Sequence, residues 1–483
     1  MNPYLRLTDV VTAMTDAQCI IVVGTKALLV EAHVLNRLPL GVREVWPTLV
    51  DSLGADDDGD SVTTFVAGPG VTRWVAVALP DQVSRHNCAA RPHAISAQIK
   101  KHVNKAKKTA ILLSLESVDH GEASTFAIAR ALPIFRVRSG PPQELRTVDV
   151  AWLNADVSLQ THAYVTAVTQ GIRYAANLVD RPTDSLNTDQ FVEEALTVAE
   201  SVGAKATTIQ GRALLDQGFG GLWGVGRAAI HPPALVVLSH EPQPGASSVV
   251  WVGKGIVYDT GGLSIKTKTG MVGMKGDMAG AAAVLAAFAT AVRTGYAGNL
   301  YAVLCIAENA IGPDATRPDD ILTLYSGKTV EINNTDAEGR LVLGDGVAYA
   351  TRHLSPTLIV DLATLTGAQL MATGKRMAAI MSNDSEWESA CVRAGKKSGD
   401  LTFPIPYCPE FFRREFRSPV ADMRNSVKDR MNAQSSCAGQ FIAEHLVSYS
   451  GVFIHVDMAG PASDDDRGTG YGVALLNEML RVG

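Results

Sequence analysis

The fold is decided by the stretch Val249–Gly262, which reads VVWVGKGIVYDTGG. Its apolar start, Val249–Val252, predicts a buried strand, and glycines, a lysine and an aspartate follow it directly. Further strand-like runs in this part of the chain are Leu300–Ile306, Thr329–Ile332, Thr357–Val360 and Val452–Val456. Alanine-rich helical stretches at Met278–Val292 and Leu341–Arg352 alternate with them. This alternation predicts an α/β fold with a mixed, mostly parallel sheet flanked by helices.

The first part of the chain predicts a second, smaller α/β domain. Its strand-like runs are Ile20–Val23, Trp74–Ala78, Ala110–Leu115 and Val148–Trp152. Apolar residues at helical spacing from His162 to Leu178 predict a helix that connects the two regions. We therefore expect two domains: a small N-terminal α/β domain over residues 1–160 and a larger C-terminal domain over 181–483, joined by a helix over 161–180.

Composition excludes several classes of protein. The chain has 483 residues, 46% of them hydrophobic and 19% charged, and a net charge of -6, which is typical of a soluble globular enzyme. This charge argues against a dominant nucleic-acid surface. A basic run could still bind nucleic acid, but we favour a solvated helix face for it; it comprises Lys100, Lys101, Lys105, Lys107 and Lys108.

The compartment is expected to be the cytoplasm. No stretch reaches the ~20 consecutive apolar residues that a membrane helix needs, so we expect no membrane association. The N-terminus does not resemble a signal peptide. The six cysteines are scattered and contain no CxxC pair, which suits a reducing compartment.

Charged residues gather where the predicted strands end. Two lysines, four carboxylates and an arginine are embedded there among glycines: Lys254, Asp259, Lys266, Asp277, Asp336, Glu338 and Arg340. In open α/β sheets the ligand site lies beyond the carboxyl ends of the strands. Four crowded carboxylates repel one another unless cations neutralise them, and two divalent ions ~3.5–4 Å apart would do so.

Each of these residues alone has a simpler explanation. Asp336 and Glu338 could be acids in the first turn of a helix, and Asp277 could be a helix N-cap. Lys254 or Lys266 alone would more often be a solvated lysine. Their joint occurrence after separate strands favours a metal site.

The run Asn334–Leu341, which reads NTDAEGRL, resembles the signature of the cytosolic leucyl aminopeptidase family. Lys254, Asp259, Lys266 and Asp277 match the other motifs of that family in order and spacing. The resemblance is nearest to the eukaryotic aminopeptidase-like branch, where Arg317–Asp320 and Tyr325–Lys328 also recur. It covers the C-terminal region, whereas the N-terminal region resembles the family only in position and size. The resemblance implies a metal-dependent exopeptidase, with residues 181–483 as its catalytic domain.

The resemblance also implies a role for each charged residue. Lys254, Asp259, Asp277 and Glu338 would hold the tighter of two divalent metal ions, with Zn²⁺ and Mn²⁺ as candidates. Asp259, Asp336 and Glu338 would hold the more exchangeable ion. Lys266 would polarise the scissile carbonyl as a catalytic residue. Arg340, with the helix N-terminus, would bind a bicarbonate that acts as general base.

The same resemblance implies the substrate and the assembly. The substrates would be peptides with a free N-terminus, and leucine or a similar apolar residue would be preferred there. The pocket for that residue would be drawn from Met274, Thr364, Gly367 and Ala459, with Ala462 nearby. The resemblance further implies a homohexamer.

Some features leave alternatives open. Tyr258 and Thr260 stand where many relatives carry phenylalanine and serine, so the preferred side chain stays open. His455 and Asp457 share a strand face and could bind metal, but we favour a structural or pocket-wall role because no companion motif is present. A non-catalytic descendant of the family is the rival to an active enzyme, and the intact set of charged residues favours the enzyme.

Overall fold

The computed structural model describes residues 4–482, except 55, 67–71, 104–105 and 140–145. Lys105 of the basic run therefore lies outside the described residues. The chain forms two compact units: an N-terminal unit up to Arg173 that includes Gly395–Leu401, and a C-terminal unit with the remainder. The change from one unit to the other falls within helix α8 (Leu159–Asp180).

The N-terminal unit is built on a six-stranded sheet in the order β1-β6-β5-β2-β4-β3. All its neighbouring strands are parallel except β3 and β4. The strands are β1 (Tyr4–Leu7), β2 (Cys19–Gly24), β3 (Asp60–Val66), β4 (Thr72–Ala78), β5 (Lys108–Leu113) and β6 (Thr147–Trp152). The helices before α8 are α1 (Val10–Met14), α2 (Lys26–Leu29), α3 (Ala32–Leu35), α4 (Leu40–Arg43), α5 (Trp46–Asp51), α6 (Pro92–His102) and α7 (His120–Arg130).

The C-terminal unit is built on an eight-stranded sheet in the order β15-β14-β17-β13-β9-β10-β8-β7. Its central strands are parallel, and antiparallel pairs lie toward both edges. The strands are β7 (Lys205–Gln210), β8 (Ala234–His240), β9 (Ser248–Asp259), β10 (Asn299–Asn309), β13 (Pro356–Ala363), β14 (Ala378–Ser382), β15 (Thr402–Pro404) and β17 (Val452–Asp457). The expected mixed, mostly parallel sheet is confirmed.

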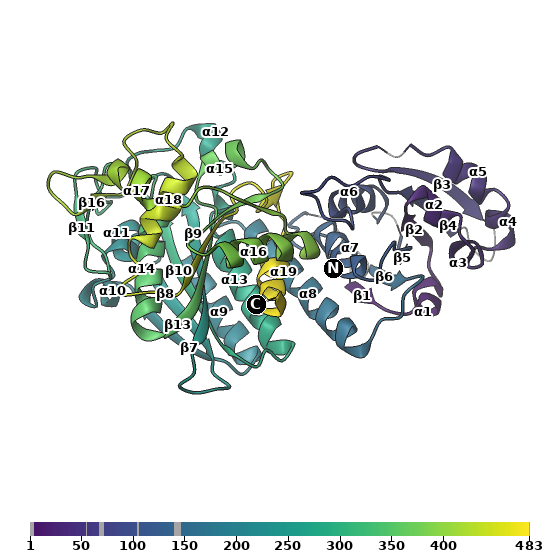
Figure 1. The fold of residues 1–483 in the computed structure, drawn as a ribbon, viewed down its shortest axis with the longest axis horizontal. Coiled ribbons are helices and arrows are strands. Elements are labelled where there is room, and N and C mark those ends of the chain that lie inside the picture. Colours follow the sequence, from purple (N-terminus) through teal and green to yellow (C-terminus); the bar gives the residue numbers. More distant parts are fainter. Residues whose placement is uncertain (1–3, 55, 67–71, 104–105, 140–145, 483) are drawn as a thin grey trace. The chain divides into compact units, whose positions relative to one another are not determined.

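Helices cover both faces of this sheet (Figure 1). One face carries α9 (Thr188–Ser201), α13 (Ala279–Arg293) and α19 (Val473–Val482). The other carries α11 (Gly220–Gly226), α14 (Gly339–His353) and α18 (Gln434–Ala443). Shorter helices are α10 (Arg212–Asp216), α12 (Lys268–Met271), α15 (Gly367–Ala372), α16 (Ser385–Ser398) and α17 (Pro409–Phe412).

Strand β9 is longer than the sequence predicts. We expected a strand that ends at Val252, but the strand continues through Lys254 to Asp259. Gly253 makes this possible, because a Cβ at this position would lie 2.5 Å from Cα of Ala281 in α13. Glycine therefore lets helix and strand backbones approach closely. The consequence is that Lys254 projects from a rigid strand.

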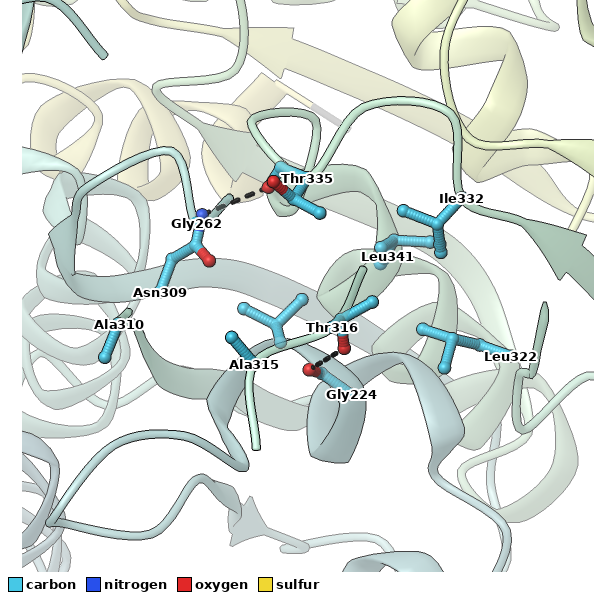
Figure 2. A pocket seen from close by; sticks show the side chains of 11 residues that line it. Gly224, Gly262, Asn309, Ala310, Ala315, Thr316, Leu322, Ile332, Thr335 and Leu341 are labelled. Carbon is cyan, nitrogen blue, oxygen red and sulfur yellow. Dashed lines mark hydrogen bonds between the residues drawn. The ribbon is translucent and has the colours of Figure 1, made fainter. Parts of the chain in front are cut away.

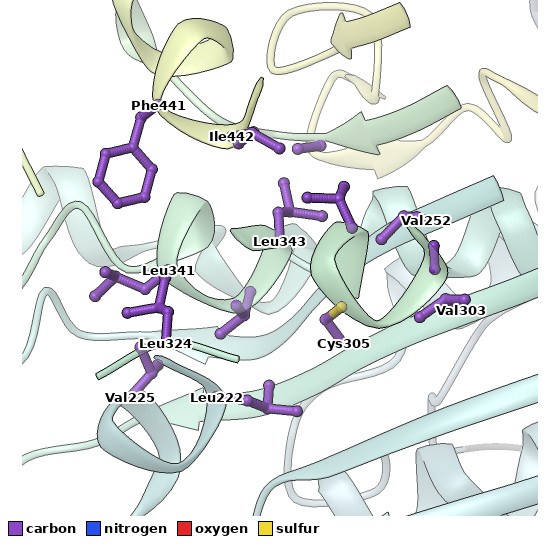
Figure 3. Close-up of a cluster of buried hydrophobic side chains, with 14 of the residues drawn as sticks. Leu222, Val225, Val252, Val303, Cys305, Leu324, Leu341, Leu343, Phe441 and Ile442 are labelled. Carbon is purple, nitrogen blue, oxygen red and sulfur yellow. The ribbon is translucent and has the colours of Figure 1, made fainter. Parts of the chain in front are cut away.

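The apolar core of the C-terminal unit fixes helix α14 against the sheet (Figure 3). Leu341 and Leu343 of α14 are fully buried, as are Val252 of β9 and Val303 of β10. Phe441 of α18 belongs to the same cluster. Because α14 begins directly after Glu338, this packing fixes the position of the acidic motif at its N-terminus.

A small three-stranded sheet lies beside this core. It consists of β11 (Ile321–Thr323), β12 (Thr329–Glu331) and β16 (Met423–Arg424), in that order. The run Thr329–Ile332, expected as a strand, therefore belongs to this sheet and not to the main one. Strand β12 leads directly into the loop that carries Asp336.

One segment of the described chain has the composition of a membrane-spanning helix. It is Lys268–Arg293, with a mean hydropathy of 1.3 in its most apolar window. However, 67% of that window is buried inside the unit. Its main helix, α13, packs directly on β9, β10 and β13. We therefore interpret its apolar character as that of a core helix.

Candidate metal centre

Strand β9 and helix α14 bring Lys254, Asp277 and Glu338 together. The Lys254 ammonium lies 2.8 Å from Oδ1 of Asp277 and 2.9 Å from Oε1 of Glu338. It also donates a hydrogen bond of 2.9 Å to the carbonyl oxygen of Thr364. All three charged residues are buried. The expected grouping of these residues is thus present in the fold.

Glycine at position 339 makes room for this lysine. A Cβ at Gly339 would lie 2.6 Å from Cε of Lys254 and 2.8 Å from its Nζ. Any larger residue at this first position of α14 would push the lysine away from Glu338.

Lys266 occupies the second half of the cluster. Its ammonium lies 2.8 Å from Oδ2 of Asp259 and 2.5 Å from Oδ1 of Asp336. Asp259, Asp336 and Glu338 each place a carboxylate oxygen within 4.8 Å of the other two. The two groups of acids therefore share Glu338, which connects the Lys254 half to the Lys266 half.

The electrostatics of the cluster suit divalent cations. Burial raises the pKa of Asp277, Asp336 and Glu338. Burial alone would lower the pKa of both lysines, but the surrounding carboxylates raise it above the ordinary value. Four carboxylates face only two ammonium groups, so negative charge is in excess when all are ionised.

Two buried oxygens point to the same conclusion. Oδ2 of Asp277 and Oε2 of Glu338 have no hydrogen-bond partner among the described residues. Buried carboxylate oxygens are normally paired, and metal ions satisfy such oxygens directly. The donor set of carboxylates and one amine nitrogen therefore fits two divalent ions.

Asn309, at the end of β10, orients Asp259. Pairing of β9 with β10 places Asn309 opposite Asp259, after a register shift between Ala307 and Glu308. Its Nδ2 donates to Oδ1 of Asp259 at 2.8 Å and to the carbonyl oxygen of Thr335 at 3.1 Å. Figure 2 shows this second bond beside the pocket that Asn309 and Thr335 line.

Thr335 ties the two acidic loops together. Its hydroxyl donates to the carbonyl oxygen of Gly261 and accepts from the N–H of Ser264, both at 2.7 Å. The hydroxyl of Ser264 accepts in return from the N–H of Thr335 at 3.1 Å. Gly261 has a φ of 86°, which only glycine adopts readily. These bonds set the spacing between Asp259 and Asp336.

Arg340 lies in the first turn of α14, next to the carboxylates. It is only 4% exposed, and burial lowers its pKa to about 10. Its Nε and Nη1 have no hydrogen-bond partner among the described residues. A buried guanidinium with free donors beside a helix N-terminus can hold an anion.

Of the residues expected to form the substrate pocket, Thr364 and Met274 lie next to Asp277 of the cluster. Thr364 follows β13 and contacts Asp277 through its hydroxyl. Gly367 opens α15 and is exposed, and Ala459 follows β17. Met274 begins the 3-10 turn Met274–Gly276, which leads directly to Asp277. Three separate segments of the chain thus contribute the expected pocket residues.

Asp457 joins two of these segments. This fully buried carboxylate accepts hydrogen bonds from the N–H groups of Leu365, Thr366 and Ala459, and from the hydroxyls of Thr366 and Ser435. Its neighbour His455 is also fully buried, with Nδ1 2.6 Å from Asp361. These contacts agree with a pocket-wall role for Asp457 and a structural role for His455.

Sequence reasoning assigned no role to three residues that support the centre: Asn309, Thr335 and Asn425. Asn309 follows the expected strand Leu300–Ile306, and Thr335 lies within the Asn334–Leu341 run next to Asp336; these positions were the available signals. Asn425 carried no signal, because it reaches the cluster only through the tertiary fold.

Comparison with known proteins agrees with this geometry. The profile described as "Cytosol aminopeptidase family, catalytic domain" matches residues 173–477. A second profile, "M17 aminopeptidase N-terminal domain 2", matches residues 18–140. The N-terminal region therefore resembles the family in sequence too, which corrects our expectation that only its position and size do.

Individual relatives match over most of their length. The mouse "Probable aminopeptidase NPEPL1" is 50% identical over 454 residues, which cover 92% of this chain and 85% of the mouse protein. The leucyl aminopeptidase of Trypanosoma brucei, solved in complex with bestatin, superposes with a TM-score of 0.92 at 36% identity and covers 100% of this chain and 96% of its own. The leucine aminopeptidase LAP1 of Caenorhabditis elegans gives a TM-score of 0.90 at 37% identity, with 99% and 98% covered.

The two-domain α/β fold, the matched catalytic domain and the relatives at this level of identity establish a hydrolase that removes N-terminal residues with the aid of metal. The chain belongs to the M17 cytosol aminopeptidase family.

Proposed function

We propose that the cluster holds two divalent metal ions. Lys254, Asp277 and Glu338 would bind one ion, Asp336 would bind the other, and Asp259 and Glu338 would bridge the two. The observation that carries the proposal is the sharing of Glu338 between two groups of acids. When bound, the ions activate a water and polarise the scissile carbonyl.

Lys254 must change its state to serve as a ligand. A metal ligand needs a free lone pair, so the amine has to release the proton it shares with Asp277 and Glu338. Its position on β9, wedged against Gly339, keeps the nitrogen at the cluster in either state.

Lys266 would act as the electrophilic catalyst. Its ammonium pairs with Asp259 and Asp336, and its side chain is 17% exposed, so it borders solvent and can turn toward a substrate. A fixed positive charge beside the scissile carbonyl stabilises the oxyanion that develops on its oxygen.

Arg340 would hold a bicarbonate as general base. The unpaired Nε and Nη1 of this buried guanidinium support an anion, and the N-terminus of α14 adds further donors. A bicarbonate held there would accept the proton of the attacking water.

The substrates would be peptides with a free N-terminus, preferably leucine or a similar apolar residue. Met274, Thr364, Gly367 and Ala459 would form the pocket for that residue, and Ala462 would lie nearby. Small and apolar side chains at three of these positions support an apolar pocket. The T. brucei relative bound to bestatin is itself named a leucyl aminopeptidase.

The metals would be Zn²⁺ or Mn²⁺. Carboxylate oxygens suit Mn²⁺, while a neutral amine nitrogen suits Zn²⁺. The cluster offers both kinds of donor, so exchange of the ions is expected to tune the activity.

The decisive experiment measures release of a fluorogenic leucine amide with added Mn²⁺, Co²⁺ or Zn²⁺. Chelation should abolish the activity, and Asp336→Ala should lower it at least 100-fold. Asp216→Ala removes an exposed carboxylate on α10 and serves as the matched control, with unchanged activity expected. Activity that survives chelation, or that is unchanged in Asp336→Ala, would refute the two-metal site.

We further propose that the enzyme works as a homohexamer in the cytoplasm, without nucleic acid. All six cysteines are free thiols, which supports a reducing compartment. A sedimentation mass near that of a 51.2 kDa monomer would refute the hexamer. Retention of DNA in a gel-shift assay at physiological salt would refute the absence of nucleic acid.

A further inference from the structure

Asn425 lies in the core beside the loop Asn333–Glu338, which carries two of the four carboxylates of the centre. The residue is 0% exposed. It follows β16, which pairs in parallel with β12, and its backbone N–H donates to the carbonyl oxygen of Glu331. The small sheet thus delivers Asn425 to the loop that leaves β12.

The Asn425 amide uses its full hydrogen-bonding capacity on this loop. Oδ1 accepts from the N–H groups of Asn333 at 2.9 Å and Asn334 at 3.3 Å. Nδ2 donates to the carbonyl oxygens of Asn334 at 2.7 Å and Ala337 at 3.3 Å. One side chain therefore fixes the backbone on both sides of Asp336.

The loop in turn bonds to the residue that follows Asn425. The side chain of Asn333 accepts from the N–H of Ser426 at 2.9 Å and donates to its carbonyl oxygen at 3.3 Å. Oδ1 of Asn334 accepts from the N–H of Asp336 at 3.0 Å. Asn425 holds Asn334, and Asn334 in turn sets the backbone of Asp336.

We propose that Asn425 is a positioning residue for the metal centre, which sets metal affinity by holding the loop that presents Asp336 and Glu338. This inference rests on the proposed metal-ligand roles of those two acids. Partners that orient metal ligands typically contribute 10–100-fold in metal affinity. Without the amide, two N–H groups and two carbonyl oxygens of the loop lose their partners, and the loop relaxes away from the ligating geometry.

Asn299 provides a matched control at the opposite end of strand β10. It is 5% exposed, and its amide likewise holds a loop backbone: it accepts from the N–H of Gln243 and donates to the carbonyl oxygens of Gln243 and Ala246. Asn299 starts β10, whereas Asn309 at its other end contacts Asp259. Truncation of Asn299 removes a comparable set of side-chain to backbone hydrogen bonds, and none of them involves the loops that carry the proposed metal ligands.

The test is titration of the metal-depleted full-length protein with Mn²⁺ alone, with free Mn²⁺ followed by electron paramagnetic resonance. Asn425→Ala should weaken the lower-affinity Mn²⁺ site about 10–100-fold. Asn425→Ser keeps a polar side chain, so its Mn²⁺ affinity should lie between those of the wild type and Asn425→Ala. It supplies the measured affinity if the alanine variant does not fold. Asn299→Ala should lower the thermal midpoint and leave Mn²⁺ affinity within about twofold of the wild type, as expected for a clamp remote from the ligands.

Two results would overturn the inference. One is Mn²⁺ affinity within about twofold of the wild type in every Asn425 variant that folds, and the other is an equal loss in Asn299→Ala, which would mark a global stability effect. Failure of the proposed function looks different: the wild-type protein would then bind fewer than two Mn²⁺ ions or keep its activity under chelation.

Discussion

The hydroxyl of Thr364 donates a hydrogen bond of 2.7 Å to Oδ1 of Asp277. A residue of the expected substrate pocket thus contacts a proposed metal ligand directly. The carbonyl oxygen of the same Thr364 accepts from Lys254 at 2.9 Å. Hydrogen bonds therefore connect the expected pocket to the proposed metal centre. Substitutions in the pocket wall should change the positions of the metal ligands.

Replacement of this threonine tests the connection. Thr364→Val keeps the shape and removes the hydroxyl, so Asp277 loses one donor, at a cost of about 1 kcal/mol. If the transition state loses stabilisation of this size, kcat/KM for leucine amide should fall roughly 5–10-fold. Thr364→Ser retains the hydroxyl and should stay within about twofold of the wild type, since the bond to Asp277 is preserved. Unchanged kcat/KM in Thr364→Val would show that the bond to Asp277 does not matter, and a loss in Thr364→Ser alone would assign the effect to the methyl group.

Lys266 should separate catalysis from metal binding. Lys266→Ala should lower kcat about 10²–10³-fold, because the charge that stabilises the oxyanion is lost. Mn²⁺ affinity should stay equal or increase, because the ammonium no longer competes for Asp259 and Asp336. Steady-state kinetics and Mn²⁺ titration of the same sample check both points. Loss of bound Mn²⁺ in this variant would contradict the assigned role.

Asp457 should control substrate selection. Asp457→Ala removes the acceptor that holds Leu365, Thr366 and Ala459 together, so the pocket walls loosen. We expect KM for leucine amide to rise about 10-fold and the preference for leucine over alanine to narrow, while two Mn²⁺ ions still bind. Ser435→Ala removes only one of these bonds and should change KM less than about threefold. Unchanged selectivity in Asp457→Ala would rule out the pocket-wall role.

Asp345 should make stability depend on pH. This fully buried carboxyl group in α14 accepts from the N–H groups of Leu222 and Tyr325, yet burial raises its pKa from 3.8 to about 7. A raised pKa in the folded state means that its stabilising contribution is full below pH 4 and declines as the pH rises toward 7. The decline continues through pH 7 and levels off once the carboxyl group is fully ionised in the folded protein as well.

Asp345→Asn cannot ionise and therefore tests this directly. The variant loses one acceptor, so it should be less stable than the wild type at pH 5. Between pH 5 and pH 8 the free energy of unfolding of Asp345→Asn should rise by about 3 kcal/mol relative to that of the wild type, because only the wild type loses stability as Asp345 ionises. Thermal midpoints of both proteins at several pH values check the trend, with Asp216→Asn as an exposed control. A constant difference across this range would contradict the raised pKa.

Much of the fold could be predicted because local patterns of apolar residues indicate its strands and helices. Short apolar runs such as Ile20–Val23 correspond to strands, and the alanine-rich Met278–Val292 corresponds to α13. The end of β9 could not be predicted, because Gly253 and Gly255 resemble a loop until α13 packs against them. The register shift before Asn309 is likewise a property of strand pairing.

The sequence by itself determined which chemistry the protein carries. The acids, lysines and glycines that follow the predicted strands form short motifs, such as Asn334–Leu341, which can be recognised from neighbouring residues of the chain. Only the tertiary structure decided how these residues are held: Asn425 reaches the 333–338 loop through a parallel strand pair, and Asp457 reaches Leu365 across 92 residues of chain. The physical reason is that hydrogen bonds act over about 3 Å in space, whatever the separation along the chain.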